Sequence, residues 1–251
     1  MDTTFEKFKS LEELDHHYDE EQKIHYIVMN KQDNKATVPW LKKFISLIDK
    51  VEDTKGPDCL VTVATGPKIY HTGFDLDEWV QNPIQQHEAF ILFNQLAARI
   101  MTCNVPTMTV VNGHAFAGGL LFALAHDHRI MRTDYGFTCL SELNIDFPLP
   151  EQYGDILRAT LPPETVRHML YGFRYNGQKS LEMKIVNQLY QDRQDMFNQI
   201  LGFKKDYGPK GLFRQSVKDA KTNVYKDVIN KLLLNPVSLQ FVRKIASMKK
   251  P

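Results

Sequence analysis

The sequence has few cysteines, and this limits the classes of protein to which it can belong. It contains three, Cys59, Cys103 and Cys139, each among apolar residues and none in a C-x-x-C pair. Disulfide-rich secreted domains and thiolate metal sites need more cysteines or closer spacing. We therefore expect reduced thiols in the protein core and a reducing compartment.

An excess of charge and a long apolar run are also absent. Lys and Arg together number 31 and Asp and Glu 30, for a net charge of +1, which argues against nucleic acid as the main partner. No apolar run reaches the roughly 18 residues of a membrane span, so we expect no membrane-spanning segment. The N-terminal stretch MDTTFEKFKSLEELD is acidic and lacks the apolar part of a signal peptide, and the sequence does not end in the peroxisomal S-K-L signal, so no targeting signal is visible.

The order of expected strands and helices predicts an α/β fold for this chain of 251 residues. Continuous apolar runs rich in β-branched residues are typical of strands buried on both faces, and here they alternate with stretches of helical periodicity. After Pro150 most segments are expected to be helical. The expected strands are 24–29, 59–64, 107–111, 130–132 and 137–140, and the expected helices include one that begins near Thr37 and Pro39, one over 84–100 and one from Val237. We therefore expect an α/β core over residues 1–190 and a helical C-terminal region over 191–251.

The stretch VNGHAFAGGLLFALAHD, at residues 111–127, has two glycines where an apolar helix is expected to begin. Glycine there costs about 0.5–1 kcal/mol relative to alanine, so Gly118 and Gly119 need a reason. One reason is tight packing between a helix and a strand. Another is that a ligand oxygen approaches the backbone N–H groups at the helix start, which have no partner within the helix. A second glycine turn, at Gly73 with Asp75 as the expected cap of the next helix, favours two amides that converge on one oxygen.

These two stretches carry a family resemblance. IYHTGFDLDEW, at residues 69–79, is close to a loop pattern F-x-x-G-x-D-[LI], and VNGHAFAGGLLFALAHDHRIMRTDYGFTCLSELNI, at residues 111–145, is close to [VI]-x-G-x-A-x-G-G-G-x-x-[LA]-A-x-x-x-D-x-R-[IV]. Both patterns belong to the crotonase superfamily, also called the enoyl-CoA hydratase/isomerase family, which the chain resembles over roughly residues 23–190. Either motif alone is weak, but the two in this order and at this spacing are specific.

The resemblance implies a spiral of ββα turns followed by a helical region, over 191–251, used for assembly and as a lid on the CoA pocket. The expected assembly is a homotrimer or hexamer, or a part of a larger complex. The implied substrate is an acyl-CoA thioester, with no separate cofactor, and its oxygen would be held by the N–H groups of Phe74 and Gly118. Gly73, Gly119 and Ala117 would keep that approach clear, although the family pattern has glycine where this chain has Ala117.

The acid–base residues indicate which reaction of this family to expect. Hydratase-type members carry two glutamates, and here the first of those positions is Leu121, which cannot move a proton, while the second is Glu142. One carboxylate above an oxyanion hole suits a proton transfer from C2 to C4 of a 3-enoyl thioester. The resemblance therefore implies a Δ3,Δ2-enoyl-CoA isomerase of fatty-acid β-oxidation. Apolar neighbours should raise the pKa of Glu142, and the expected ones are Leu121, Leu140, Leu143 and Phe147.

Two other hypotheses stay open. One is a different acyl-CoA enzyme of the same fold, such as a hydratase that uses Glu142 alone, a thioesterase or a decarboxylase. The other is a non-catalytic subunit, which would explain Leu121 and the altered stretch DFPLPEQYG at residues 146–154. The joint presence of Gly73, Gly118 and Glu142 argues against this loss of activity.

The remaining site residues concern the CoA half of the substrate. Lys68 lies in a loop suited to the nucleotide, and Phe241 and Lys244 in the last expected helix are further candidates, although a solvated basic tail explains that helix equally well. The histidines lack a metal-binding spacing such as H-E-x-x-H, so no metal is expected. The implied location is the mitochondrial matrix or a peroxisome rather than the cytosol.

Overall fold

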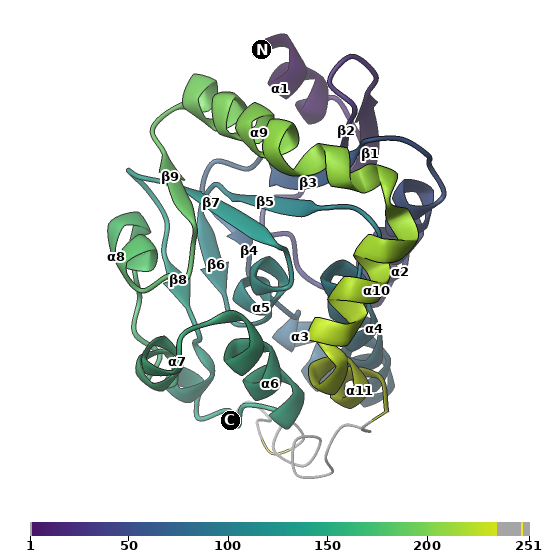
Figure 1. Cartoon of the computed structure of the whole chain (residues 1–251). Coiled ribbons are helices and arrows are strands. Elements are labelled where there is room, and N and C mark those ends of the chain that lie inside the picture. The colour runs from purple at the N-terminus through teal and green to yellow at the C-terminus, as the bar shows by residue number, and fades with distance from the viewer. Residues whose placement is uncertain (1, 235–246, 248–251) are drawn as a thin grey trace.

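A computed structural model, which describes residues 2–234 and residue 247, shows the chain folded around one six-stranded sheet (Figure 1). The strand order is β1-β2-β3-β5-β7-β9, in which β1 and β2 are antiparallel and the other neighbours are parallel. The strands are β1 (Leu14–Asp19), β2 (Ile24–Met29), β3 (Cys59–Ala64), β5 (Thr107–Val111), β7 (His128–Arg132) and β9 (Gln188–Tyr190). The apolar runs of β2, β3 and β5 fit this arrangement because helices cover both faces of a parallel sheet.

A second, three-stranded parallel sheet lies beside the first and has the order β4-β6-β8. Its strands are β4 (Ile69–His71), β6 (His114–Phe116) and β8 (Thr138–Cys139). Each of them follows a strand of the large sheet, so the pairs β3–β4, β5–β6 and β7–β8 repeat. The helices α3 (Leu76–Gln81) and α4 (Pro83–Met101) follow the first pair, and α5 (Gly118–Leu124) follows the second. The predicted spiral of ββα turns is confirmed.

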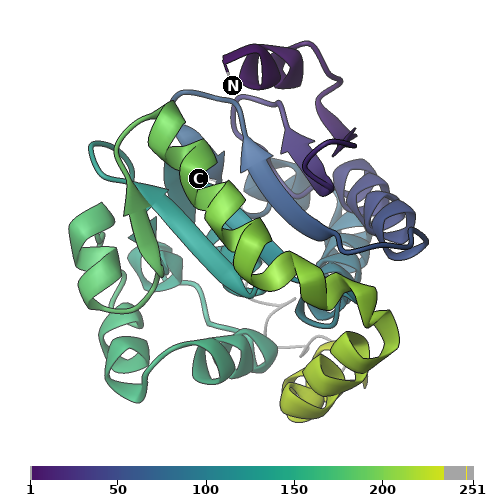
Figure 2. The ribbon, with the colours of Figure 1, turned by 45° about the horizontal axis from the view of Figure 1, so that its top comes forward.

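The two faces of the large sheet bury separate sets of apolar side chains. Ile27 and Met29 of β2 face a core shared with α4, α5 and α2 (Val38–Glu52), whereas Ile24, Tyr26 and Val28 face the other side. On that side α9 (Arg193–Tyr207) and α1 (Asp2–Lys9) complete the core, and Figure 2 shows α9 lying across the strands. The predicted division after residue 190 falls between β9 and α9, and it stays a prediction.

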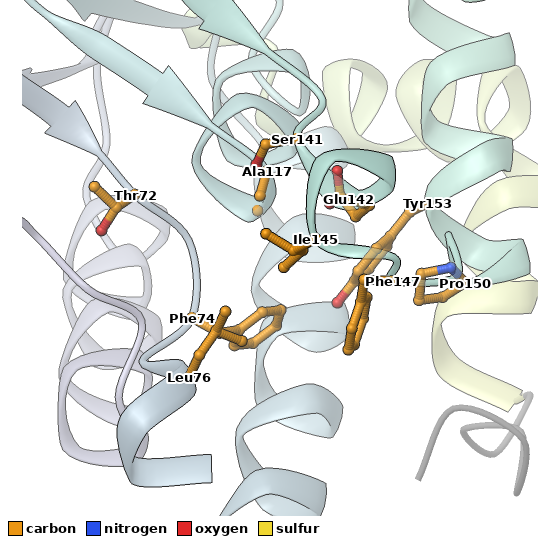
Figure 3. Close-up of a pocket in the computed structure, with 11 residues that line it drawn as sticks. Thr72, Phe74, Leu76, Ala117, Ser141, Glu142, Ile145, Phe147, Pro150 and Tyr153 are labelled. Atoms are coloured by element: carbon orange, nitrogen blue, oxygen red, sulfur yellow. The ribbon is translucent and has the colours of Figure 1, made fainter. Parts of the chain in front are cut away.

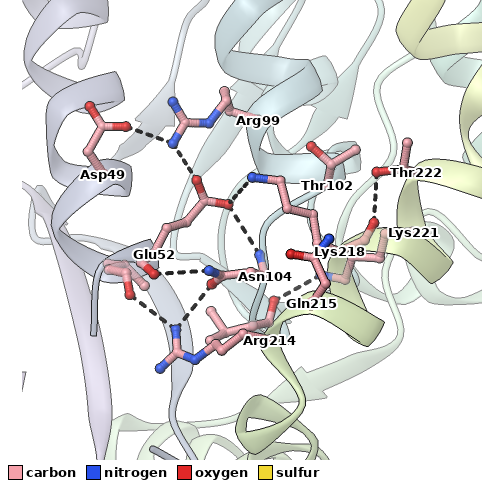
Figure 4. Close-up of polar contacts among 12 residues, drawn as sticks. Asp49, Glu52, Arg99, Thr102, Asn104, Arg214, Gln215, Lys218, Lys221 and Thr222 are labelled. Atoms are coloured by element: carbon pink, nitrogen blue, oxygen red, sulfur yellow. Dashed lines mark hydrogen bonds and ion pairs between the residues drawn. The ribbon is translucent and has the colours of Figure 1, made fainter. Parts of the chain in front are cut away.

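The C-terminal helices attach to the core through polar and apolar contacts. Arg214 of α10 (Arg214–Val224) donates to the carbonyl oxygen of Val51 and to Oδ1 of Asn104, each at 3.1 Å (Figure 4). The next helix, α11 (Lys226–Leu234), packs against α4 and α6. The remaining elements are α6 (Glu151–Thr160), α7 (Pro163–Met169), α8 (Gly177–Glu182) and the 3-10 helices η1 (Glu142–Ile145) and η2 (Gly208–Leu212).

The helix start expected at Thr37 is confirmed, and the strands expected over 130–132 and 137–140 correspond to β7 and β8, whereas β1, β4, β6 and β9 were missed. Oγ1 of Thr37 accepts a hydrogen bond from the N–H of Trp40 at 3.4 Å, and a proline follows in the first turn of α2. The helix expected over 84–100 is α4. The sequence did not indicate β1, because LDHHYD is polar, or β4 and β6, because three residues show no periodicity. The helix expected from Val237 lies outside the described residues.

Candidate active site

A pocket opens where the loop after β4 meets the starts of α5, η1 and α6. Its empty volume is about 550 Å³, and aromatic and aliphatic side chains form most of its wall (Figure 3). The lining residues are Thr72, Phe74, Leu76, Ala117, Gly118, Ser141, Glu142, Ile145, Phe147, Pro150 and Tyr153. The structure therefore brings together the three residues predicted to be catalytic, Phe74, Gly118 and Glu142.

The loop that carries Phe74 is held on both sides. Gly73 has a φ of +84°, and its N–H donates to Nδ1 of His71 at 2.9 Å. Burial lowers the pKa of His71 to about 3, so this ring stays neutral and can accept that bond. The carbonyl oxygen of Gly73 accepts from the N–H of Ala36 at 2.9 Å. Because the peptide is planar and trans, the N–H of Phe74 points to the opposite side of the loop from that bond.

The start of α5 lies directly against this loop. A β-carbon built on Gly73 would lie only 2.9 Å from the backbone nitrogen of Gly118, so a side chain at Gly73 would separate the two turns. The carbonyl oxygen of Ala117 accepts from the N–H groups of Leu120 and Leu121, at 3.0 and 3.2 Å, and so points into the helix. The N–H of Gly118, in the same peptide, points out of the helix start, where the helix has no acceptor for it.

Ala117, which stands where the family pattern has glycine, has a strained backbone even though its side chain is small. Its backbone has φ 50° and ψ −122°, a conformation that L-residues rarely adopt. Strain of this kind costs on the order of 1–3 kcal/mol and persists when the surroundings enforce it. The N–H of Ala117 donates to the carbonyl oxygen of Cys139 at 2.9 Å, which ties the strained residue to β8. The strain therefore lies at the residue whose ψ angle sets the direction of the Gly118 N–H.

Glu142, the first residue of η1, is a buried carboxyl in an apolar wall. It is 8% exposed, and burial raises its pKa from 4.5 to about 7, as the sequence predicted. In the part of the chain that the structure describes, its Oε2 has no hydrogen-bond partner. Of the expected apolar neighbours Phe147 lines the same pocket, whereas Leu143, next to Glu142 in the chain, is 55% exposed.

Sequence reasoning missed Tyr153, the other ionisable residue in the pocket wall. Tyr153 lies in the first turn of α6 and is 3% exposed, and no hydrogen-bond partner of its hydroxyl is found among the described residues. In Figure 3 the hydroxyl points into the pocket. No local pattern could have found it, because one tyrosine in a helix after PLPEQ shows the same periodicity as a core residue.

The other predicted site residues lie away from the pocket wall or outside the described residues. Gly119 packs against β4, since a β-carbon there would lie 2.0 Å from the carbonyl oxygen of His71. Leu121 is fully buried behind the wall, and Lys68 lies on an exposed part of the loop between β3 and β4. Phe241 and Lys244 fall outside the described residues.

Among the described residues, no set of three or more His, Cys, Asp or Glu side chains is placed to share a metal ion. None of the described helices combines the length and apolar character needed to cross a membrane. The three cysteines are buried and unpaired with one another, as predicted.

Comparison with known proteins points to one family. The enoyl-CoA hydratase/isomerase family matches residues 19–222. Enoyl-CoA delta isomerase 3 of Arabidopsis thaliana is 32% identical over 157 residues, which cover 59% of this chain and 65% of that protein. The peroxisomal enoyl-CoA delta isomerase 2 of the same plant is 30% identical over 162 residues, 60% of this chain and 66% of that protein. These matches span slightly less than two thirds of the relatives' length.

Solved structures of low sequence identity share the fold. Human mitochondrial delta3-delta2-enoyl-CoA isomerase has a TM-score of 0.75 at 17% identity, over 94% of this chain and 96% of that one. An enoyl-CoA hydratase from Mycobacterium marinum has a TM-score of 0.77 at 16% identity, over 94% and 99% of the two chains. The predicted crotonase-like fold is confirmed. With the family match over most of its length, this chain belongs to the enoyl-CoA hydratase/isomerase family.

Proposed function

We propose that this protein is a Δ3,Δ2-enoyl-CoA isomerase that acts in fatty-acid β-oxidation. The observation that carries the proposal is that Glu142 is the one carboxyl group among the described residues that line the pocket. The two turns whose backbones meet at Gly73 and Gly118 contribute Phe74 and Gly118 to the same pocket. The isomerase names of the Arabidopsis relatives support the same reaction.

The proposed reaction moves one proton and two electron pairs. The ionised carboxylate of Glu142 takes a proton from C2 of a 3-enoyl thioester, and the electrons of that C–H bond form a dienolate. The negative charge rests on the thioester oxygen, to which the N–H groups of Phe74 and Gly118 donate. The protonated Glu142 then returns its proton to C4, which leaves the double bond between C2 and C3. Because nothing is oxidised or reduced, the substrate thioester needs no further cofactor.

The environment of Glu142 supports its role as a proton shuttle. A group that first accepts and then donates a proton works best when its pKa lies near the working pH. Burial brings the pKa of Glu142 to about 7, which meets this requirement. Leu121 supports isomerisation over hydration, because a buried leucine supplies no second carboxylate to hold a water molecule.

Assembly, nucleotide binding and location are further parts of the proposal. Exposed apolar side chains near the pocket, among them Ile145, Tyr171 and Phe173, support burial in a homotrimer or hexamer. Lys68 and Lys244 are proposed to contact the CoA nucleotide. The relatives with organelle names support a peroxisomal or mitochondrial location. Sedimentation that shows a stable monomer at micromolar concentration would contradict the assembly.

One assay tests the reaction directly. Purified protein is mixed with 3-hexenoyl-CoA, and the conjugated 2-enoyl thioester is followed by its absorbance, beside a parallel assay of water addition to 2-hexenoyl-CoA. We expect isomerisation without comparable hydration, and kcat/KM that rises about tenfold per pH unit below pH 7 and then levels off as Glu142 ionises. Hydration as the faster reaction would favour a hydratase. Thioester binding with no turnover would favour the non-catalytic subunit.

A further inference from the structure

We propose that the hydroxyl of Tyr153 binds a neutral oxygen atom on the far part of the acyl group, so that acyl thioesters with such an oxygen bind more tightly than plain hydrocarbon ones. This inference rests on the proposed function insofar as it places an acyl thioester in the pocket. It starts from a polar atom that is buried in the pocket wall and unpaired among the described residues.

The ring of Tyr153 is fixed by two aromatic side chains of α4. It stacks on Phe90 with ring centroids 5.1 Å apart and an interplanar angle of 26°. It meets Phe93 edge to face at 5.6 Å and 71°. These contacts hold the ring, and with it the hydroxyl, in the pocket wall, where Tyr153 is 3% exposed. The hydroxyl is therefore arranged in advance for a bound group.

The hydroxyl remains a hydrogen-bond donor at physiological pH. Burial, and then the nearby charge of Glu142, raise the pKa of Tyr153 far above its ordinary value. A buried donor without a partner is unfavourable, and a ligand that supplies an acceptor removes that cost on binding. A site of this kind discriminates strongly against an analogue that lacks the matching polar atom.

The charges of the pocket indicate which oxygen it accepts. Of the described residues that line it, none is Lys, Arg or His, and Glu142 is acidic. A second carboxylate there would lack a cation and would be repelled by ionised Glu142. A hydroxyl, keto or ether oxygen can accept from Tyr153 without these costs. The pocket therefore favours a neutral oxygen.

The direction of the side chain indicates where on the acyl group that oxygen lies. In Figure 3 the hydroxyl of Tyr153 points between the rings of Phe74 and Phe147, away from Ala117 and Ser141, whereas the carboxyl group of Glu142 lies nearer to Ala117 and Ser141. In the proposed reaction Glu142 faces C2 to C4. An oxygen that meets Tyr153 is therefore carried beyond C4.

Calorimetric titration of the full-length protein tests this inference without turnover. The ligands are hexanoyl-CoA, 5-hydroxyhexanoyl-CoA, 6-hydroxyhexanoyl-CoA and the charged adipoyl-CoA. We expect at least one hydroxyacyl thioester to bind about tenfold more tightly than hexanoyl-CoA, and adipoyl-CoA to bind no more tightly than hexanoyl-CoA. Tyr153→Phe should abolish the advantage of the hydroxyl group and leave the affinity for hexanoyl-CoA within about twofold.

Tyr175→Phe is the matched control. Tyr175 has a buried hydroxyl without a partner among the described residues, but it does not line the pocket, so this variant should keep the hydroxyl preference. Three results would each overturn the inference. They are equal binding of all the neutral ligands, a hydroxyl preference that survives in Tyr153→Phe, and tightest binding of adipoyl-CoA. The outcomes for the two proposals are separate: isomerisation of 3-hexenoyl-CoA without a hydroxyl preference overturns only the inference, and a preference without isomerisation overturns only the isomerase.

Discussion

Two buried carboxyl groups in this protein have opposite surroundings. Asp58, just before β3, is 1% exposed and accepts hydrogen bonds from the hydroxyl of Tyr18 at 3.1 Å and from Arg214 of α10 at 2.8 Å. Glu142 in the pocket wall is 8% exposed, and its Oε2 has no partner among the described residues. The fold thus pairs the carboxylate of Asp58 where it joins a distant helix to the sheet, and leaves Oε2 of Glu142 without a partner among the described residues where a ligand is proposed to bind.

The difference has consequences for both stability and activity. Removal of one partner of a buried ion pair leaves the other charge uncompensated and destabilises a protein by about 3–5 kcal/mol. An unpaired buried carboxylate is unfavourable in the folded protein, as its raised pKa shows. A neutral amide at position 58 should therefore destabilise the folded protein, whereas a neutral amide at position 142 should stabilise it.

Glu142→Gln should have the largest effect, on the rate of isomerisation. The amide keeps the shape of the side chain but cannot accept the proton from C2, so turnover of 3-hexenoyl-CoA should fall by about 10²–10⁴-fold, the usual share of general acid–base catalysis. Initial rates from the absorbance of the product measure this, and calorimetry with hexanoyl-CoA should show nearly unchanged binding. A variant that isomerises at the wild-type rate would remove Glu142 from the mechanism.

Asp58→Asn should have the largest effect on stability. It leaves Arg214 without its carboxylate partner, so we expect the free energy of unfolding to fall by about 3 kcal/mol, near the lower end of the usual range because the Arg214 side chain is partly exposed. Urea denaturation followed by circular dichroism measures the change. The rate per folded molecule should stay near that of the wild type, in contrast to Glu142→Gln. An unchanged denaturation midpoint would show that the pair contributes little.

Glu142→Gln should instead stabilise the folded protein, in a pH-dependent way. The pKa of Glu142 is about 7 in the folded state against 4.5 as a reference for the unfolded chain, so between these values the folded state holds more protons and stability falls as pH rises. Above pH 7 the ionised group lowers stability by up to about 3 kcal/mol, and below pH 4.5 this effect is absent. Urea denaturation of both proteins at pH 5 and pH 8 should show a gain for the variant that grows with pH. A gain that is equal at the two pH values would contradict the raised pKa.

Ala117→Gly should have the smallest effect, in the same pocket wall. Glycine adopts a φ of 50° freely, so the change should relieve the backbone strain. Part of this gain is offset because glycine increases the conformational entropy of the unfolded chain. We expect a gain of about 1 kcal/mol in the free energy of unfolding, measured as an increase in Tm, with activity retained. Ala115→Gly, in β6, is the matched control and should destabilise the protein. A loss of stability in Ala117→Gly would show that the methyl group contributes by packing.

The local parts of the fold and site could be predicted from the sequence. Gly73 and Gly118 were found because each lies in a turn between an expected strand and an expected helix, where a glycine needs a structural reason. Thr37 was found because a helix cap acts on the N–H of a residue three positions away. The buried strands were found because both faces of a parallel sheet require apolar side chains.

Other features depend on contacts between distant parts of the chain. Lys68 was expected to contact the CoA nucleotide because of its place in the loop TGPKIY; it lies on an exposed part of that loop outside the pocket wall, and the contact stays a prediction. The strain at Ala117 was missed because it depends on the backbone bond that this residue makes to β8. Such features follow from the packing of elements, which a single sequence does not display.

By itself, the sequence determined the buried strands and the helix caps, because each depends on residues close in the chain, whereas the ββα spiral and the expected role of Glu142 came from the family resemblance. Only the tertiary structure decided that Asp58 is paired with Arg214, 156 positions away, and that the hydroxyl of Tyr153, which has no partner among the described residues, points into the pocket. The physical reason is burial. Side chains from several segments together exclude water from a polar group. Such a buried group needs a partner within the protein, or it remains available to a ligand.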